Sequence, residues 1–456
     1  MSSTRRTSTP GEAPVRAVVV GTGSRAQVFT TALAGRPRFR VAALCDPNPV
    51  RIAHHQRLLR DAGEPEAAAW TPEDFPDRLR AEGIEEVVVT TVDALHDAYI
   101  VPALEAGCRV VTEKPMTTDA GRCRRILRAV EATGGELAVA FNYRFNPVHE
   151  EVRRQLAGGA IGEVLSVHFE WLLDVRHGAD YFRRWHREKH LSGGLMVHKA
   201  SHHFDLVNWW LGARPQHVFG HGRLAFYGRE AGERTGYRRD YERAHGAAAA
   251  ADDPFALTLA DSDALRSLYL DAEQHDGYLR DRNVFGDGIT IEDDMAVLVR
   301  YDTGTAMTYH LTAYSPWEGY RVAFNGTGGR LELEVEESRW QPPRPPAASD
   351  KGARGDSAVA TAGGPRILIR PLWREPYDIP VPDYGHAGHG GGDGRMLTAL
   401  YGPADPADTP GTADAAGQCA TAVDGALALV TGLAANESFA TGARVVTSDL
   451  VAVPSR

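Results

Sequence analysis

The stretch Val18-Val19-Val20-Gly21-Thr22-Gly23-Ser24-Arg25-Ala26 joins an apolar strand, a glycine turn and the start of a helix. Gly21 permits the tight turn, Gly23 lets a pyrophosphate approach the backbone, and Ala26 keeps helix and strand close together. A diphosphate would then bind the free N–H groups at the helix N-terminus. The alternative is an ordinary turn. The stretch predicts a dinucleotide site whose contacts here are Gly21, Gly23, Ser24 and Arg25.

An acidic residue ends the next apolar run, in Ala43-Leu44-Cys45-Asp46. A carboxylate at this place accepts both ribose hydroxyls of the adenosine half, and its charge repels a 2′-phosphate. Asp46 therefore favours NAD over NADP as the cofactor. Arg51 is close enough in sequence to offset this preference, and a capping role of Asp46 on the following helix is the alternative.

Apolar runs and helical patterns alternate from the first strand onward. Such alternation indicates βαβ units and a parallel sheet covered on both faces. We expect a disordered tail over 1–13 and a Rossmann-type, doubly wound domain over 14–141. The expected strands are Val15–Val20, Phe39–Leu44, Glu86–Thr91, Arg109–Thr112 and Glu136–Phe141.

The pattern changes after Asn142, where longer strand-like runs follow one another with hairpin breaks such as Asp302-Thr303-Gly304. This indicates an α+β domain over 142–456, with a large, mostly antiparallel sheet and helices on one side. A polar insertion is expected over 228–288. The stretch 341–410 holds 12 of the 27 prolines and predicts loop or disorder. A last helix is expected over 415–434 and a final strand over 443–453.

Composition excludes several classes of protein. The 456 residues suggest two or three domains, with 43% hydrophobic residues and a net charge of −10. That charge argues against a general nucleic-acid binder, and no apolar run of about 18 residues suggests a membrane span. The four cysteines show no metal-type spacing. We expect a cytoplasmic protein that binds neither nucleic acid nor membrane.

Two further strand ends carry polar groups, in Thr91-Val92-Asp93-Ala94-Leu95-His96 and in Thr112-Glu113-Lys114-Pro115. Ligands of doubly wound sheets bind at the carboxyl ends of the strands. Lysine is rare here: four of the 50 basic residues are Lys and the other 46 are Arg. A Lys retained in such a chain suggests a need for an ammonium group. The additional predicted cofactor contacts are Thr91, His96, Glu113 and Lys114.

Together with the glycine turn, Glu113-Lys114-Pro115 resembles the family of glucose–fructose oxidoreductase and inositol dehydrogenase (Gfo/Idh/MocA). The stretch Ser192-Gly193-Gly194-Leu195-Met196-Val197-His198-Lys199-Ala200-Ser201-His202-His203-Phe204-Asp205 is similar to the family's Gly-Gly and Asp-x-Gly-x-His-x-x-Asp pattern. The resemblance implies that Lys114 contacts the reacting hydroxyl and that His202 accepts or relays its proton. His198 stands where the family usually has Asp, and Ala200 replaces Gly. The resemblance also implies a homodimer or homotetramer that associates through the second-domain sheet.

Histidine and aromatic residues gather before this motif, since nine of the 18 His lie between 168 and 221. Aromatic planes interleaved with Arg and His suit a polyhydroxylated ligand. The predicted substrate contacts are Tyr143, Arg144, Arg176, His177, Tyr181, Trp185, His186, Lys199, Asp205 and Tyr278. His198 and His202 have the i, i+4 spacing of a metal pair. Contacts to sugar hydroxyls or a purely structural role are the alternatives, and we expect no metal.

These patterns predict an NAD-dependent oxidoreductase that transfers a hydride between nicotinamide and a ring carbinol of a sugar, sugar derivative or cyclitol. His202 is the expected base, Lys114 its electrostatic partner and His198 a third catalytic group. One alternative is an NAD-requiring glycosidase or lyase that oxidises a sugar transiently and returns the hydride. A catalytically silent NAD-binding regulator is a third possibility.

Overall fold

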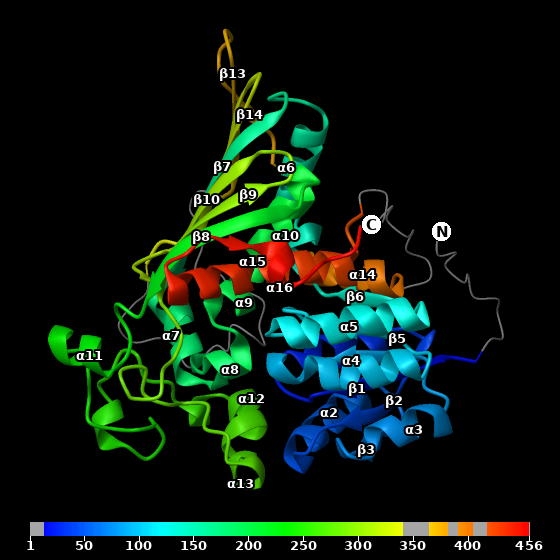
Figure 1. Cartoon of the computed structure of the whole chain (residues 1–456). Helices are drawn as coiled ribbons and strands as arrows, with labels where there is room; N and C mark the ends of the chain where they lie inside the picture. Colours follow the sequence, from blue (N-terminus) through cyan, green and yellow to red (C-terminus); the bar gives the residue numbers. More distant parts are fainter. Residues whose placement is uncertain (1–12, 341–363, 382–390, 405–416, 456) are drawn as a thin grey trace.

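The computed structural model describes residues 13–340, 364–381, 391–404 and 417–455. Two sheets organise this chain, and they stand beside one another with helices between them (Figure 1). In the part of the chain that is described, no helix is long and apolar enough to cross a membrane.

The first sheet has seven strands in the order β15-β6-β5-β4-β1-β2-β3. Strands β1 to β6 are parallel, and β15 pairs antiparallel with β6. Because β1 lies between β2 and β4, the strand order reverses beside β1, and this is where doubly wound sheets bind their ligand. The strands are β1 (Val15–Val20), β2 (Phe39–Cys45), β3 (Ala68–Trp70), β4 (Glu86–Val89), β5 (Arg109–Thr112), β6 (Leu137–Val139) and β15 (Ala420–Thr421).

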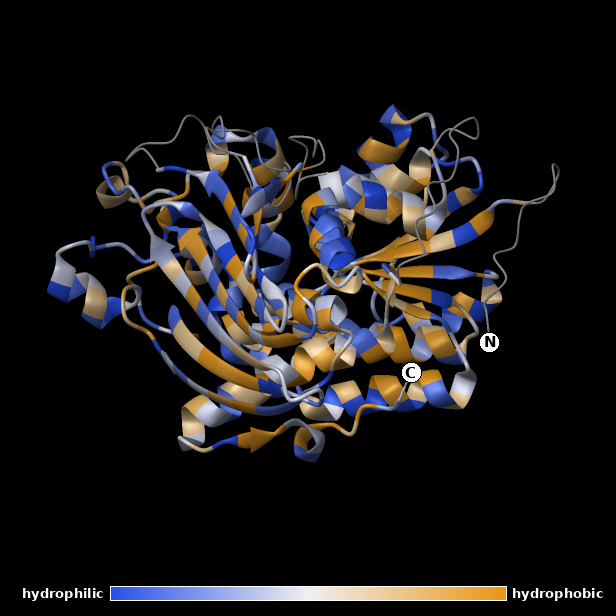
Figure 2. Cartoon of the chain, turned by 90° about the horizontal axis from the view of Figure 1, so that it is seen from above, coloured by the Kyte–Doolittle hydropathy of each residue, from blue (hydrophilic) through white to orange (hydrophobic). Residues whose placement is uncertain are grey.

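Helices cover both faces of this sheet, so its strands consist almost wholly of buried aliphatic residues. Figure 2 shows the strands as mainly hydrophobic. The helices are α1 (Ala26–Ala34), α2 (Pro49–Asp61), α3 (Phe75–Ala81), α4 (His96–Glu105) and α5 (Ala120–Thr133). The predicted doubly wound parallel sheet is confirmed, with one strand supplied by the far end of the chain.

The second sheet has nine strands in the order β14-β13-β12-β11-β7-β10-β9-β8-β16. All neighbours are antiparallel except β7 and β10, which confirms the expected mostly antiparallel sheet. The strands are β7 (Val164–Asp174), β8 (Pro215–Arg223), β9 (Asp294–Tyr301), β10 (Ala306–Ser315), β11 (Glu318–Gly326), β12 (Gly329–Ser338), β13 (Arg366–Pro371), β14 (Tyr377–Ile379) and β16 (Val445–Val446).

Helices cover one face of the second sheet, and the alternating burial of its strands leaves the other face open. The covering helices include α6 (Pro147–Ala157), α7 (Val175–Arg183), α9 (Leu195–His198), α10 (Ala200–Leu211) and α15 (Ala422–Thr441). Helix α15 also reaches the first domain. A Cβ on Gly432 would lie 2.4 Å from the carbonyl oxygen of Met196, and one on Gly425 would lie 2.8 Å from Val139.

Three sequence expectations differ from the structure. The last helix is α15, which begins at Ala422 because Thr421 and Asp424 form a capping box there. The expected final strand is only β16, followed by α16 (Thr447–Leu450). The proline-rich stretch 341–410 lies partly outside the described residues, yet its described parts form β13, β14 and α14 (Gly392–Tyr401). Strand β13 is ordered because it pairs with β12.

The region 228–288 contains short helices and loops beside the sheet, namely α11 (Arg229–Thr235), α12 (Asp263–Leu265), η6 (Arg266–Leu270) and α13 (Glu273–Asp276). A small apolar cluster of Leu259, Leu265, Leu268 and Tyr269 holds its second half together. This half lies beside α2 of the first domain (Figure 1).

Candidate active site

The glycine turn after β1 has the geometry that a dinucleotide requires. Gly21 has φ +81°, and a Cβ there would lie 2.7 Å from the backbone of Thr91. A Cβ on Gly23 would meet no heavy atom within 4 Å, so the space above it is open. The hydroxyl of Thr22 is buried and has no hydrogen-bond partner in the described chain. The diphosphate of NAD fits this turn, because the turn offers open space above Gly23 and a hydroxyl without a hydrogen-bond partner.

Asp46 lies at the end of β2 beside this turn. Its two carboxylate oxygens accept the backbone N–H groups of Thr22 at 2.7 Å and of Asn48 at 2.8 Å. Helix α2 is capped by Asn48, whose side chain accepts the N–H of Val50. Asp46 is therefore fixed in the turn and is not the helix cap.

Arg25, which directly follows the glycine turn, links that turn to two other segments at the carboxyl edge of the first sheet. Its guanidinium binds Glu113 after β5 at 2.6 Å and Asp393 in the first turn of α14 at 2.7 Å. These two carboxylates raise the pKa of Arg25, against the opposing effect of burial, which is the largest single influence. Asp393 also accepts an N–H from the side chain of Asn142 at 2.9 Å. Arg25 and Glu113 thus hold α14 against the dinucleotide edge.

Lys114 meets the second domain at the carboxyl end of β5. Its Nζ lies 3.0 Å from the carbonyl oxygen of His198 and 3.3 Å from Nε2 of the same residue. The other ring nitrogen, Nδ1, lies 2.5 Å from a carboxylate oxygen of Asp93, which begins the short 3-10 helix η1 (Asp93–Leu95) after β4. Since an amine donates, Nε2 is the accepting nitrogen and Nδ1–H donates to Asp93. Asp93, His198 and Lys114 form one hydrogen-bonded chain across the two domains.

Burial and neighbouring charges tune this chain. Burial lowers the pKa of Lys114 to about 8, although Asp93 and Glu113 oppose the shift. Burial and then the nearby ammonium of Lys114 lower the pKa of His198 well below its usual value, so the imidazole is neutral. Burial raises the pKa of Asp93, against the effect of Lys114. An amine with a pKa near neutrality is suited to proton transfer.

Helix α10 begins beside this chain and carries His202. The imidazole of His202 stacks on Tyr143, with ring centroids 4.3 Å apart and planes inclined by 15°. Lys199 donates to the Tyr143 hydroxyl at 3.1 Å and lies 4.8 Å from the ring centroid of Trp171. Lys199 also separates α9 from α10, so His198 and His202 lie on two helices.

The aromatic residues predicted to contact substrate form a second group of side chains, beside His198 and apart from the Tyr143–His202 stack. Trp185 stacks on His186 with centroids 3.5 Å apart, and the His186 ring stands edge-on to His198 at 4.1 Å. Tyr181 lies 5.7 Å from His198. The Tyr181 hydroxyl lies 3.2 Å from His177, which binds Glu318 at 2.6 Å. The rings of Tyr181, Trp185 and His186 thus surround the His198 ring.

Other predicted site residues have structural partners. Arg144 and Asp205 form an ion pair at 2.6 Å with 1% exposure of each side chain. Arg144 also binds Asp424 of α15 at 3.2 Å, so the pair fastens α10 to α15. The structure thus gives Arg144 and Asp205 a structural role in the interior, and their predicted contact with substrate stays a prediction. His96 is buried, and its ring nitrogens lie 2.9 Å from Pro115 O and 3.3 Å from Thr91 O.

Arg176 and Tyr278, also predicted to contact substrate, are both partly buried. Arg176 is in the first turn of α7, where the side chain of Asp174 accepts its backbone N–H. Burial lowers the pKa of its guanidinium. The Tyr278 ring lies 5.9 Å from the guanidinium of Arg51. Burial raises the pKa of the Tyr278 phenol.

In the His198/His202 pair, both ring nitrogens of His198 have protein partners, Lys114 and Asp93. Within the described ranges, no group of three His, Cys, Asp or Glu side chains is placed to hold a metal ion.

Sequence reasoning missed Asp93, although this residue lies in the strand-end stretch that drew attention to Thr91 and His96. A carboxylate one loop away from Lys114 on the neighbouring strand could have indicated the contact. The pairing with His198 could not be foreseen, because it depends on how α9 is placed against β4.

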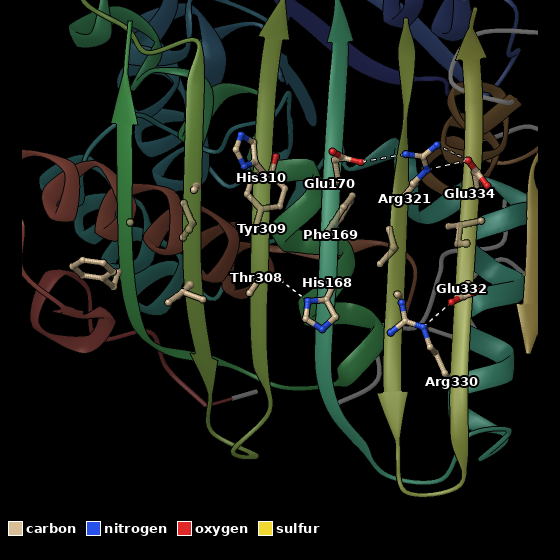
Figure 3. Close-up of a pocket in the computed structure, with 18 of the residues that line it drawn as sticks. His168, Phe169, Glu170, Thr308, Tyr309, His310, Arg321, Arg330, Glu332 and Glu334 are labelled. Atoms are coloured by element: carbon tan, nitrogen blue, oxygen red, sulfur yellow. Dashed lines mark hydrogen bonds and ion pairs between the residues drawn. The ribbon is translucent and has the colours of Figure 1, made fainter. Parts of the chain in front are cut away.

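A hollow of about 640 Å³ lies on the open face of the nine-stranded sheet and not at the dinucleotide edge. Figure 3 shows Arg321 between Glu170 and Glu334 on this face, with Arg330 bound to Glu332. Leu298 and Phe219 are also exposed there, at 52% and 44%. This hollow shares no residue with the candidate active site.

A glycine-turn Rossmann domain joined to a sheet domain, with Lys and His meeting between them, defines a two-domain nucleotide-dependent oxidoreductase. Residues 15–141 match the model of the oxidoreductase family with an NAD-binding Rossmann fold. Residues 153–346 match the C-terminal alpha/beta domain of the same family. The chain belongs to this oxidoreductase family, Gfo/Idh/MocA, and its first domain is of the NAD-binding type.

Relatives support this assignment. The Bacillus subtilis oxidoreductase YteT is 34% identical over 411 residues, which are 85% of this chain and 89% of YteT. An inositol 2-dehydrogenase of Rhizobium meliloti is 31% identical over 206 residues, 45% of this chain and 57% of that protein. A solved oxidoreductase domain protein of Kribbella flavida covers 97% of this chain and 100% of its own, with a TM-score of 0.62 and 15% identity. At that identity, the structural match shows the fold alone.

Proposed function

We propose that the protein is an NAD-dependent dehydrogenase that moves a hydride between nicotinamide and a ring carbinol of a sugar, sugar derivative or cyclitol. The observation that carries the proposal is the contact between Lys114 of the first domain and His198 of the second. It lies at the carboxyl edge of the parallel sheet, beside the glycine turn. The inositol dehydrogenases among the relatives act on a cyclitol, which supports a ring carbinol as substrate.

NAD supplies the hydride acceptor when it is bound, and the protein must take the hydroxyl proton. A neutral Lys114 amine has two N–H groups, and the two contacts to His198 use both of them. Its lone pair is then left to accept the proton of the substrate hydroxyl. Since burial lowers the pKa of Lys114 to about 8, a substantial fraction is neutral near that pH.

The sequence assigns the role of base to His202. In this proposal Lys114 takes that role, because it has both the shifted pKa and the proton-relay partner. His202, stacked on Tyr143, supplies with Lys199 a polar wall for the substrate hydroxyls. Trp185, His186 and Tyr181 form the facing aromatic wall, which suits the apolar side of a ring.

The test is a panel of cyclitols, aldoses, uronates and methyl glycosides incubated with NAD, followed by NADH absorbance and product analysis. Stoichiometric NADH with at least one ring polyol is expected. Glycoside cleavage that requires NAD without net NADH would favour the redox-neutral glycosidase or lyase. Turnover of none of the panel, despite nucleotide binding, would favour the silent regulator.

A matched control uses a second lysine. Lys189 binds Glu292 and belongs to neither wall of the candidate site. Lys189→Gln is expected to keep the activity found in the panel. Lys114→Arg is expected to lose it, because a guanidinium is not deprotonated at neutral pH. Full activity of Lys114→Arg would contradict the assignment of Lys114.

We also place the homodimer or homotetramer that the resemblance implies on the open face of the nine-stranded sheet. Exposed apolar residues such as Leu298 and Phe219 lie there among paired charges. Leu298→Arg is expected to shift the molecular mass in solution toward the monomer.

A further inference from the structure

The second half of the insertion packs on the adenosine side of the dinucleotide edge. The side chain of Asn48 donates to the carbonyl of Ala272 and to the carboxylate of Asp276, both at 2.9 Å. His54 of α2 lies 2.9 Å from the hydroxyl of Ser267. These contacts hold 267–276 against the N-terminal half of α2 (Figure 1).

The same segment binds Arg51. Asp276 lies 2.6 Å from one terminal nitrogen of Arg51, and the carbonyl of Leu268 accepts the Nε–H at 3.1 Å. The Arg51 side chain is 12% exposed and that of Asp276 is 22% exposed. Partial burial makes this pair stronger than an exposed ion pair.

Asn48 links the insertion to the residue that marks the ribose site. Its backbone N–H donates to Asp46, and its side chain donates to Asp276. Two carboxylates, one from each domain, therefore bracket Asn48 at the end of β2. Arg51, the cation that could offset the charge of Asp46, is bound to the second of these carboxylates.

We propose that Asp276, on the insertion, is a determinant of nucleotide specificity, because it binds Arg51 and so excludes the 2′-phosphate of NADP. A 2′-phosphate carries about two negative charges near neutral pH. It would face Asp46 and Asp276 together, and the Asp276 carboxylate would compete with it for the Arg51 guanidinium. This inference rests on the proposed function in one respect, namely that NAD is the cofactor.

The experiment measures binding without turnover. ADP and its 2′-phosphorylated counterpart, adenosine 5′-diphosphate 2′-phosphate, are titrated calorimetrically into the full chain, and NADH and NADPH are titrated by fluorescence. The unmodified protein is expected to prefer the ligands without a 2′-phosphate. Asp276→Asn keeps the shape of the side chain and removes the charge that pairs with Arg51. We expect it to tighten the 2′-phosphorylated ligands at least about tenfold and to change ADP and NADH by less than about threefold.

Two variants make the result specific. When Arg51→Gln is added to Asp276→Asn, the tighter binding of 2′-phosphorylated ligands is expected to disappear, since the freed Arg51 guanidinium is its source. Asp271→Asn removes the same charge from an exposed position of the same segment and is expected to change neither ligand class. Thermal unfolding of each variant reports whether the segment stays folded.

Three results would overturn the proposal. They are an unmodified protein that does not discriminate against the 2′-phosphate, an Asp276→Asn variant with unchanged discrimination, and tighter binding of 2′-phosphorylated ligands that survives Arg51→Gln.

Arg51→Gln alone is a second test if Asp276→Asn unfolds. It should leave the 2′-phosphorylated ligands weak, and a tenfold loss of their binding would contradict the proposal. Intact ADP binding without polyol oxidation contradicts the proposed function and not this inference.

Discussion

The catalytic end and the adenosine end of the dinucleotide edge use charge differently. At the catalytic end, Asp93 and His198 are almost wholly buried, with 4% and 10% of their side chains exposed. At the adenosine end, Arg51 and Asp276 remain in partial contact with solvent. Asp93 follows a strand of the fold itself, whereas Asp276 comes from an inserted segment. The proposed proton transfer therefore depends on residues of the common fold. The proposed choice between NAD and NADP depends on the inserted segment.

The largest effect is expected for Lys114→Gln, since an amide cannot take a proton. We expect kcat to fall roughly 10³-fold, with NADH binding changed little, measured by steady-state kinetics and fluorescence titration. His202→Gln should cost less. A greater loss for His202→Gln than for Lys114→Gln would return the role of base to His202.

The pH dependence of oxidation tests the same end without a mutation. The base must be neutral, and burial lowers the pKa of Lys114 to about 8. Activity should therefore rise with pH and level off above that value. It should fall tenfold per unit below it, roughly a hundredfold at two units below the pKa. A kcat/KM profile that is flat across this range would contradict Lys114 as the proton acceptor.

Asp93→Asn removes the anion that orients His198. Activity should fall roughly thirtyfold, because an amide fixes the imidazole tautomer less firmly. The Asp93 carboxylate also raises the pKa of Lys114, so the midpoint of the pH profile should move to lower pH. A loss of activity with an unmoved midpoint would indicate a purely structural role for Asp93.

The smallest effect concerns the adenosine end. Asp46→Asn replaces a charged acceptor and should weaken NADH binding about tenfold, measured by fluorescence titration. The NADPH affinity should change less, since one repulsion is lost together with the hydrogen bond. Asp61→Asn, exposed at the end of α2, is the matched control. Equal losses for both nucleotides would weaken the contrast between the two ends.

Local sequence predicts much of the first domain. Buried strands, the glycine turn and Asp46 are all encoded within a few residues, because a parallel sheet with two covered faces needs near-continuous apolar runs. The strand β3 (Ala68–Trp70) was missed because three residues, Ala-Ala-Trp, are too few to show a periodic pattern. Strand β13 was missed because its order comes from pairing with β12.

The site was predictable in its residue types more than in its contacts. Lys114 and His198 were selected from motifs that lie on separate domains, but the Asp93–His198 contact arises only when those domains pack. Arg144 and Asp205 show the opposite case. Both suited a ligand by chemistry, and the fold instead pairs them with one another in the interior. Arg51 was noticed as a possible phosphate ligand, and its partner, 225 residues later, was not.

Helix α15 has a consequence for how the protein is made. It packs on Met196, two residues before His198, and on Val139 of the first sheet, yet it lies more than 200 residues after either of them. A ribosome releases Lys114 and His198 well before it releases Gly425 and Gly432. Both sheets can begin to form during synthesis, but the alignment of their edges waits for this helix. The candidate active site is therefore among the last parts of the molecule to be completed.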